Sequence, residues 1–150
     1  MVTSIDDFYL THADQSELAS KYPTNPLVQH RGQPGTHDLP LAQQTLSSLR
    51  DRQKVQIPVY DKSAFNGQGD RTDSSVWESF NDSEPSVDVV LIEGWCVGFR
   101  PLSDAALEEK HARAVEEENN GKTNGQLCKH RLENLRVINE ALRRYDAITE

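Results

Sequence analysis

The order of apolar and polar positions along the chain predicts an α/β fold. Residues 89–92, Val-Val-Leu-Ile, form a continuous apolar run, which is typical of a strand buried on both faces in a parallel sheet covered by helices. Residues 2–5, Val-Thr-Ser-Ile, also predict a strand. Residues 55–60 predict a third, in which Pro58 indicates an edge position or the strand's end. We therefore expect a parallel sheet flanked by helices.

Segments with apolar residues at helical spacing alternate with these strands along the chain. This spacing predicts helices over 13–22, over a segment that begins near 39, and over 103–118 and 127–145. Pro23 should stop the first helix, and Asp38 should cap the second, with Pro40 in its first turn. The expected apolar face of the second helix consists of Leu39, Leu41, Leu46 and Leu49. A short helix is predicted around 76–80.

The last helix carries an apolar stripe at helical spacing. We interpret this stripe as core or docking surface rather than as a cofactor site; it consists of Leu132, Leu135, Ile138 and Leu142. The acidic run at 116–118 is most simply a solvated helix face, and residues 119–125 predict a flexible turn.

Composition narrows the classes of function. The 150 residues fit one domain, and a net charge of −8 argues against nucleic acids and anionic membranes as partners. No apolar run approaches the roughly 20 residues of a membrane span. The first residues lack the features of a signal peptide, and Cys96 and Cys128 form no disulfide framework. We expect a cytoplasmic protein.

Acidic residues follow both of the predicted parallel strands. Glu93 comes directly after the apolar run, and Asp6 and Asp7 follow the first strand together with two aromatic residues. The carboxyl ends of parallel strands are where α/β sheets bind ligands, and acids there hold Mg²⁺ in nucleotide-phosphate enzymes. The alternatives are a solvated Glu-Gly turn after the run and an acidic cap for the helix that begins near residue 13.

Two loops concentrate positive charge in this acidic chain. The irregular stretch 23–40 holds four prolines, Arg31 and two histidines, and loops of this length in a compact domain are often functional. The loop 61–71 combines Lys62 and Arg71 with two glycines, which suits an anion site. A plain surface linker and solvated charges are the alternatives.

Two short sequences imitate known motifs without meeting their requirements. Gly121-Lys122-Thr123 matches the end of the phosphate-binding motif G-x-x-x-x-G-K-[ST], but Glu116 replaces the first glycine and no strand is predicted before it. Cys128-Lys129-His130 offers too few ligands for a zinc site.

Taken together, several blocks in one order resemble the D-glycerate 3-kinase-like P-loop kinases, including fungal members of unassigned substrate. Uridine kinase, phosphoribulokinase and bacterial pantothenate kinase are more distantly similar. The resemblance covers nearly the whole chain and is weakest over 104–126. Its blocks are Asp-Asp-Phe-Tyr at 6–9, Asn-Pro at 25–26, Arg-Gly-Gln-Pro-Gly-Thr-His-Asp at 31–38, Pro-Val-Tyr-Asp-Lys-Ser at 58–63, Gly-Asp-Arg at 69–71 and Glu-Gly-Trp at 93–95.

The resemblance implies a P-loop NTPase fold of the kinase type, with ATP and Mg²⁺ as cofactors. It implies that Asp6 is the base for the acceptor hydroxyl or a metal ligand, and that Glu93 is the Walker-B-type acid and second metal ligand. The implied acceptor-binding residues are Arg31, Thr36, His37, Asp38, Lys62 and Arg71. The acceptor would be a small molecule with a hydroxyl group, and glycerate is one candidate because its carboxylate would suit the cations.

The chain also departs from the family pattern. Family members carry a strand, a P-loop and a helix before the Asp-Asp-Phe-Tyr block, and they continue beyond the segment that matches the C-terminal helix. We therefore expect residues 1–150 to form one partial kinase domain, incomplete at both ends, whose cofactor-binding residues are unknown. We also expect the DNA upstream of Met1 to encode the P-loop. The isolated chain should be inactive as a kinase, and the alternative is a non-catalytic binding relative that kept the scaffold.

Overall fold

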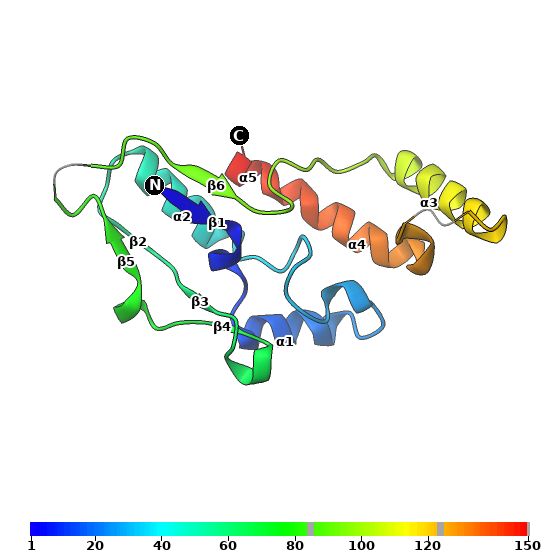
Figure 1. Cartoon of the computed structure of the whole chain (residues 1–150), viewed down its shortest axis with the longest axis horizontal. Helices are drawn as coiled ribbons and strands as arrows, with labels where there is room; N and C mark the ends of the chain where they lie inside the picture. Colours follow the sequence, from blue (N-terminus) through cyan, green and yellow to red (C-terminus); the bar gives the residue numbers. More distant parts are fainter. Residues whose placement is uncertain (84–85, 123–124, 150) are drawn as a thin grey trace.

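A parallel pair of strands joins two distant segments of the chain. The computed structural model describes residues 1–83, 86–122 and 125–149. Strand β1 (Val2–Ser4) runs parallel to β6 (Leu91–Glu93), with Val2 opposite Leu91 and Ser4 opposite Glu93. Figure 1 shows the two strands side by side in the left half of the view. The predicted α/β class with parallel strands is confirmed.

Two short antiparallel pairs form separate two-stranded sheets. Strand β2 (Val55–Ile57) pairs with β5 (Glu78–Phe80), and β3 (Tyr60–Asp61) pairs with β4 (Asp70–Arg71). Pro58 follows the last residue of β2, so it marks a strand end as predicted. The predicted helix around 76–80 is wrong: a 3-10 turn ends at Val76 and the chain then extends. Its backbone groups are satisfied by pairing with β2 instead of by a helix.

The positions of the helices agree with the sequence pattern except at the C-terminal end. They are α1 (His12–Lys21), α2 (Leu39–Arg50), α3 (Asp104–Asn119), α4 (Leu132–Leu142) and the short α5 (Asp146–Thr149). Asp38 caps α2 by accepting a hydrogen bond from the Leu41 amide, and Pro40 lies in the first turn, as predicted. The last predicted helix begins later, at Leu132, because His130 and Arg131 are extended.

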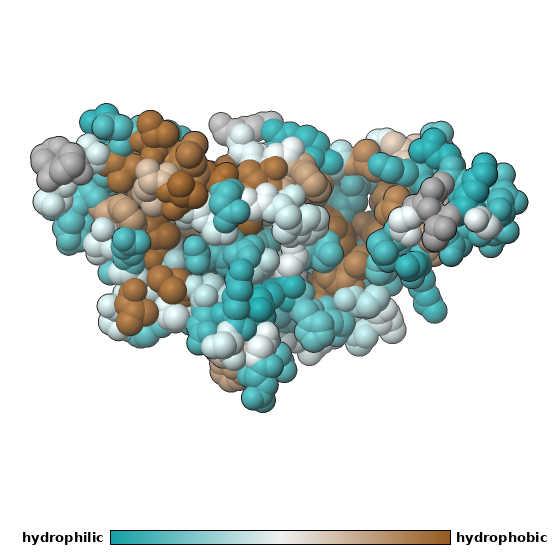
Figure 2. Space-filling view, viewed as in Figure 1, coloured by the Kyte–Doolittle hydropathy of each residue, from teal (hydrophilic) through white to brown (hydrophobic). Residues whose placement is uncertain are grey.

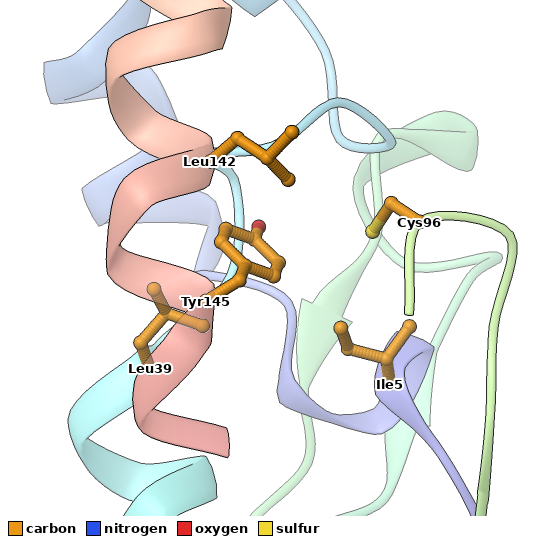
Figure 3. Close-up of a cluster of buried hydrophobic side chains, with 5 residues drawn as sticks. All are labelled: Ile5, Leu39, Cys96, Leu142 and Tyr145. Carbon is orange, nitrogen blue, oxygen red and sulfur yellow. The ribbon is translucent and has the colours of Figure 1, made fainter. Parts of the chain in front are cut away.

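One buried cluster joins α2 and the C-terminal helical segment to the turn after β1 and the loop after β6. It consists of Ile5, Leu39, Cys96, Leu142 and Tyr145, and Tyr145 is only 1% exposed. Figure 3 shows Leu142 and Tyr145 on the C-terminal helical segment, with Ile5 and Cys96 facing them from two other parts of the chain. The buried face of α2 differs from the prediction at two positions: Ala42 and Thr45 are buried, whereas Leu41 and Leu46 are half-buried.

One face of the parallel pair remains exposed, which corrects the expectation that residues 89–92 are buried on both faces. Val90 and Ile92 point toward α2 and α5. Val2, Val89 and Leu91 are 65%, 63% and 59% exposed. Figure 2 shows a hydrophobic area on this side of the molecule. Among the described residues, helices cover only one side of these strands, so alternate side chains of the apolar run lie in solvent.

The two imitation motifs do not form sites in the described part of the chain. Gly121 and Lys122 follow the end of α3 rather than a strand, and Thr123 lies outside the described residues. Cys96 and Cys128 are free thiols, and no group of three or more metal-ligating side chains occurs among the described residues. In the same residues, no helix is both long and apolar enough to cross a membrane.

Candidate active site

Asp6 lies just past the carboxyl end of β1 and makes an ion pair with Lys62. A 3-10 turn (Ile5–Phe8) follows β1, and the Ser4 hydroxyl accepts the Asp6 amide hydrogen. This turn directs the Asp6 carboxylate toward the loop after β3, where Lys62 Nζ donates to Asp6 Oδ2 at 2.7 Å. Two segments 56 positions apart therefore meet at one charged contact.

The neighbours of Asp6 keep it ionised. Burial raises the pKa of its carboxyl group, but hydrogen bonds from Lys62 and Tyr9 and the charge of Lys62 outweigh burial, so the pKa lies below its usual value. The adjacent Asp7 shows the opposite shift, because burial and the nearby Asp6 charge raise its pKa. At neutral pH Asp6 is thus a carboxylate that can accept a proton or bind a cation.

Tyr9 connects Asp6 to the interior of the molecule. Its burial and its hydrogen bond to the Asp6 carboxylate raise the pKa of the Tyr9 phenol, so it stays protonated. The Tyr9 ring stacks on His37 with centroids 4.5 Å apart and meets the Tyr60 ring edge-on at 5.3 Å. His37 is itself held by Tyr145, whose hydroxyl oxygen lies 2.6 Å from His37 Nδ1. This aromatic stack fixes one wall beside Asp6.

Arg31 supplies a second cation near Asp6. Its guanidinium group donates to the carbonyl oxygens of Gly67 and Gln68, and it lies 5.7 Å from the centre of the Tyr60 ring. Gly69 makes this approach feasible: a Cβ atom there would lie 2.5 Å from Tyr60 Cε1 and 2.9 Å from Arg31 Nη1. The loop after β3 is therefore held against Arg31 by contacts that require glycine at position 69.

These side chains surround an open cavity of about 520 Å³, which we call the acceptor cavity. It is lined by Asp6, Tyr9, His30, Arg31, Lys62, Asn66, Gly67 and Gln68. A carboxylate, a phenol and two cations thus face one space, an arrangement that can bind a small anionic molecule and orient one of its hydroxyl groups toward a base.

Three other predicted acceptor residues do not line this cavity, because their side chains hold the surrounding loops. Arg71 Nη2 donates to the Tyr9 carbonyl oxygen at 2.9 Å and to Asp38 Oδ2 at 3.0 Å, and its side chain is only 12% exposed. Thr36 is fully buried; its hydroxyl donates to the Gln33 carbonyl oxygen and accepts the Gly32 amide hydrogen. Asp38 and Thr36 therefore shape the loop that carries Arg31.

His37 is the fourth predicted acceptor residue outside the lining of the acceptor cavity. It is 5% exposed, and burial lowers the pKa of its imidazole to about 4, so it is neutral at physiological pH. It contacts Tyr9, which does line the cavity. Its position is one layer behind the cavity wall.

The chain is similar in sequence to known kinases. The chain is 48% identical over 118 residues to an uncharacterized kinase of Schizosaccharomyces pombe, mug58, matching 77% of this chain and 42% of that protein. It is 43% identical over 105 residues to a probable ATP-dependent kinase of Saccharomyces cerevisiae, TDA10, matching 66% of this chain and 34% of that protein. No family model matches.

A solved structure shows the same fold. The D-glycerate 3-kinase from Cryptococcus neoformans superposes with a TM-score of 0.84 at 42% sequence identity, over 98% of this chain and 49% of that protein. The chain belongs to the D-glycerate 3-kinase-like family. Its fold is the P-loop kinase fold of that family. The chain spans less than half the length of each of these three relatives.

Within this kinase fold, Glu93 lies at the same sheet edge as Asp6. It ends β6 opposite Ser4, two residues before Asp6, and its side chain is exposed. Gly94 lets the chain turn closely over the 3-10 turn after β1, since a Cβ atom there would lie 2.3 Å from Ile5 Cγ2. Two carboxylates at one edge fit Mg²⁺, which in such enzymes takes one or two protein carboxylates together with phosphate oxygens.

Sequence reasoning did not select some residues that line the acceptor cavity. The pattern drew attention to the aromatic pair after Asp6 but did not assign Tyr9 to the site, and His30 was noted only as part of an irregular stretch. The segment 66–68 gave one available signal, the pair of glycines at 67 and 69. In the structure both Phe65 and Asn66 have positive φ angles, a backbone conformation that a sequence pattern rarely reveals.

Proposed function

We propose that the chain binds the phosphoryl acceptor in an ATP-dependent small-molecule kinase of the D-glycerate 3-kinase type. In this role Asp6 accepts the proton of the acceptor hydroxyl, and Lys62 and Arg31 bind the acceptor's negative charge. The observation that carries the proposal is the 2.7 Å Lys62–Asp6 ion pair at the wall of the acceptor cavity. The similarity of the chain to kinases supports the same role.

The proposed reaction moves the γ-phosphoryl group of ATP to a hydroxyl oxygen of the acceptor. As that oxygen attacks phosphorus, Asp6 takes its proton and the bond to the ADP oxygen breaks. Asp6 and Glu93 are the residues that would hold Mg²⁺, which when bound neutralises charge on the phosphates. Lys62 keeps Asp6 ionised before the acceptor enters, and the aromatic stack around Tyr9 keeps its carboxylate in place.

D-Glycerate is the acceptor that the proposal favours. A relative of the same fold is a D-glycerate 3-kinase, and glycerate carries one carboxylate and two hydroxyl groups. The carboxylate would bind Arg31 and the Lys62 ammonium, which leaves a hydroxyl group near Asp6. Thr36, His37, Asp38 and Arg71 support the proposal indirectly, because they hold the loops that position these groups.

We further propose that these 150 residues do not phosphorylate an acceptor unaided. They contain no G-x-x-x-x-G-K-[ST] sequence, the backbone of which supplies most contacts to the β- and γ-phosphates in P-loop enzymes. Acceptor binding and catalysis are therefore tested separately.

The first experiment titrates D-glycerate into the ¹⁵N-labelled chain and follows backbone NMR signals. We expect saturable shifts at Asp6, Arg31 and Lys62, and none in the Lys62→Met variant. The matched control is Lys54→Met, which removes an exposed lysine that precedes β2, pairs with Asp82 and does not line the acceptor cavity. Absence of binding to the parent chain would contradict the proposal.

The second experiment tests catalysis in a complete kinase. A chimera in which these 150 residues replace the matching segment of the Cryptococcus neoformans enzyme should phosphorylate D-glycerate with Mg-ATP. A folded chimera that binds ATP but transfers no phosphate to D-glycerate would favour the alternative of a non-catalytic binding relative.

A further inference from the structure

A second concave surface lies between α1 and α4, on the opposite side of the loop that carries Arg31. This α1–α4 groove has a volume of about 460 Å³, within the range of roughly 300–1,000 Å³ typical of small-molecule sites. In the described residues it shares no lining residue with the acceptor cavity. Its apolar surface consists of Leu18, Tyr22, Val28, Pro34, Val137 and Ala141.

The rim of the groove is positively charged in a chain that is acidic as a whole. Lys21, Arg136 and Arg144 line it together with a single acid, Glu140. Arg136 pairs with Glu108, and Glu140 accepts a hydrogen bond from Arg143 Nε at 2.7 Å. Lys21 and Arg144 are exposed and make no ion pair within the described ranges. Two cations are thus available to a ligand beside an apolar surface.

The apolar floor lies deeper than the cations. Val28 and Pro34 are buried, whereas Lys21, Glu140 and Arg144 are exposed. A ligand that matches this distribution has an apolar body and one anionic group at its end. A multiply charged phosphate would gain nothing from the floor, and a neutral apolar molecule would leave the cations unused.

We propose that the α1–α4 groove binds a small amphipathic carboxylate. Its carboxylate lies between Lys21 and Arg144, and its hydrocarbon part covers Val28, Pro34 and Ala141. This site is separate from the acceptor cavity, and the proposal does not depend on kinase activity.

Gly35, which lines the groove, belongs to the loop 31–38 that carries Arg31 and His37. The Gly35 amide donates to Tyr145 Oη at 3.0 Å, and the same oxygen lies 2.6 Å from His37 Nδ1. A Cβ atom on Gly35 would lie 3.0 Å from Ala141 Cβ, so the loop and α4 are tightly packed there. A ligand in this groove therefore contacts Gly35, which is hydrogen-bonded to the Tyr145 hydroxyl that holds His37.

The test uses octanoate as the probe with the 150-residue chain below the concentration at which octanoate forms micelles. Calorimetry should show saturable binding, with acetate and 1-octanol each at least tenfold weaker. In ¹⁵N NMR, octanoate should shift the signals of Lys21, Gly35 and Ala141. The Lys21→Gln/Arg144→Gln double variant should bind octanoate at least tenfold more weakly.

The control variant carries the same change of charge elsewhere. Lys110→Gln/Lys129→Gln replaces two exposed lysines outside the groove and should bind octanoate as the parent chain does. Equal affinity for 1-octanol, unchanged affinity in the groove variant, or shifts confined to the acceptor cavity would each overturn the proposal. So would binding to anionic lipid vesicles without binding to monomeric octanoate. Failure of D-glycerate binding alone would affect only the proposed function.

Discussion

Tyr145 Oη and His37 Nδ1 lie 2.6 Å apart, although the two residues are 108 positions apart in the sequence. The same oxygen accepts the Gly35 amide hydrogen, so the hydroxyl hydrogen is available to His37. His37 Nε2 is buried and has no hydrogen-bond partner among the described residues. This arrangement holds a neutral imidazole against the Tyr9 ring.

His37 should make the stability of the chain pH-dependent. Its folded pKa of about 4 lies below the ordinary 6.5, so between these values the unfolded chain binds a proton that the folded chain does not. The free energy of unfolding should therefore decrease as the pH falls from about 6.5 toward 4, by a few kcal/mol at most. Urea unfolding at several pH values measures this, and His37→Gln should flatten the slope in that window. An equal slope in both proteins would contradict the assignment.

Replacing Tyr145 by Phe should destabilise the chain. The change leaves His37 Nδ1 without its partner in a buried position, which costs about 1–3 kcal/mol, and it also removes the partner of the half-buried Gly35 amide. Thermal unfolding followed by circular dichroism measures the loss. Tyr22→Phe is the matched control, because Tyr22 is only half-buried and its ring packs against Lys21. Equal melting temperatures for parent and Tyr145→Phe would refute this role.

Asp6→Asn should lower kcat of the chimera by about 10² or more, because a positioned general base contributes on the order of 10²–10⁴. Asp7→Asn should have the smaller effect. We expect this order because Asp6 lines the acceptor cavity beside Lys62, whereas Asp7 is not among the residues that line it. Steady-state kinetics with saturating Mg-ATP distinguishes them. An inactive Asp7→Asn enzyme beside an active Asp6→Asn enzyme would reverse the assignment.

The exposed face of β1 and β6 should bind a hydrophobic dye. Val2, Val89 and Leu91 lie together in solvent, which is a large apolar area for a small chain. Leu91→Lys should lower the fluorescence of bound anilinonaphthalene sulfonate without lowering the melting temperature. Ile92→Lys, on the opposite face of the same strand, should lower the melting temperature instead. A parent chain that binds no dye would show that this face is covered in solution.

Calorimetry should detect at most weak binding of Mg-ATP to the 150-residue chain. The reason is the absence of the phosphate-binding motif from these residues, since Lys62 and Arg31 face the acceptor cavity instead. A micromolar dissociation constant would contradict this expectation and would require a different phosphate site.

The sequence predicted the elements whose signals are local. The capping of α2 by Asp38 and the end of β2 before Pro58 depend on neighbouring residues, and both predictions are confirmed. The short helix at 76–80 was wrong because its residues pair with β2, a partner that no local pattern identifies. Burial of Leu91 was wrong for a related reason: an apolar run does not show which of its faces another element covers.

Among the candidate site residues, too, some positions could be predicted from the sequence and others depended on tertiary contacts. The resemblance selected Asp6, Arg31 and Lys62, which the fold brings to one cavity. It could not separate them from Thr36 and Asp38, which belong to the same block as Arg31. The Thr36 hydroxyl bonds within the loop, and the Asp38 carboxylate caps α2 and pairs with Arg71. Whether a side chain faces a cavity or a neighbouring loop depends on tertiary packing. A sequence motif gives only the order of the residues in the chain.

The pairing of β1 with β6 has a consequence for the order in which the molecule is built. The amino group of Met1 donates to the Val89 carbonyl oxygen across 88 positions, and Asn25 donates to the Asn134 carbonyl oxygen across 109. Such distant contacts make folding slow, since a long loop must close before they form. During synthesis on the ribosome, Asp6 emerges before Lys62, and Lys62 emerges before Glu93 and Tyr145. Strand β1 can pair with β6, and Ile5 can pack against Tyr145, only after those later segments have left the exit tunnel. Until then Ile5 lacks the apolar partners that bury it in the folded molecule.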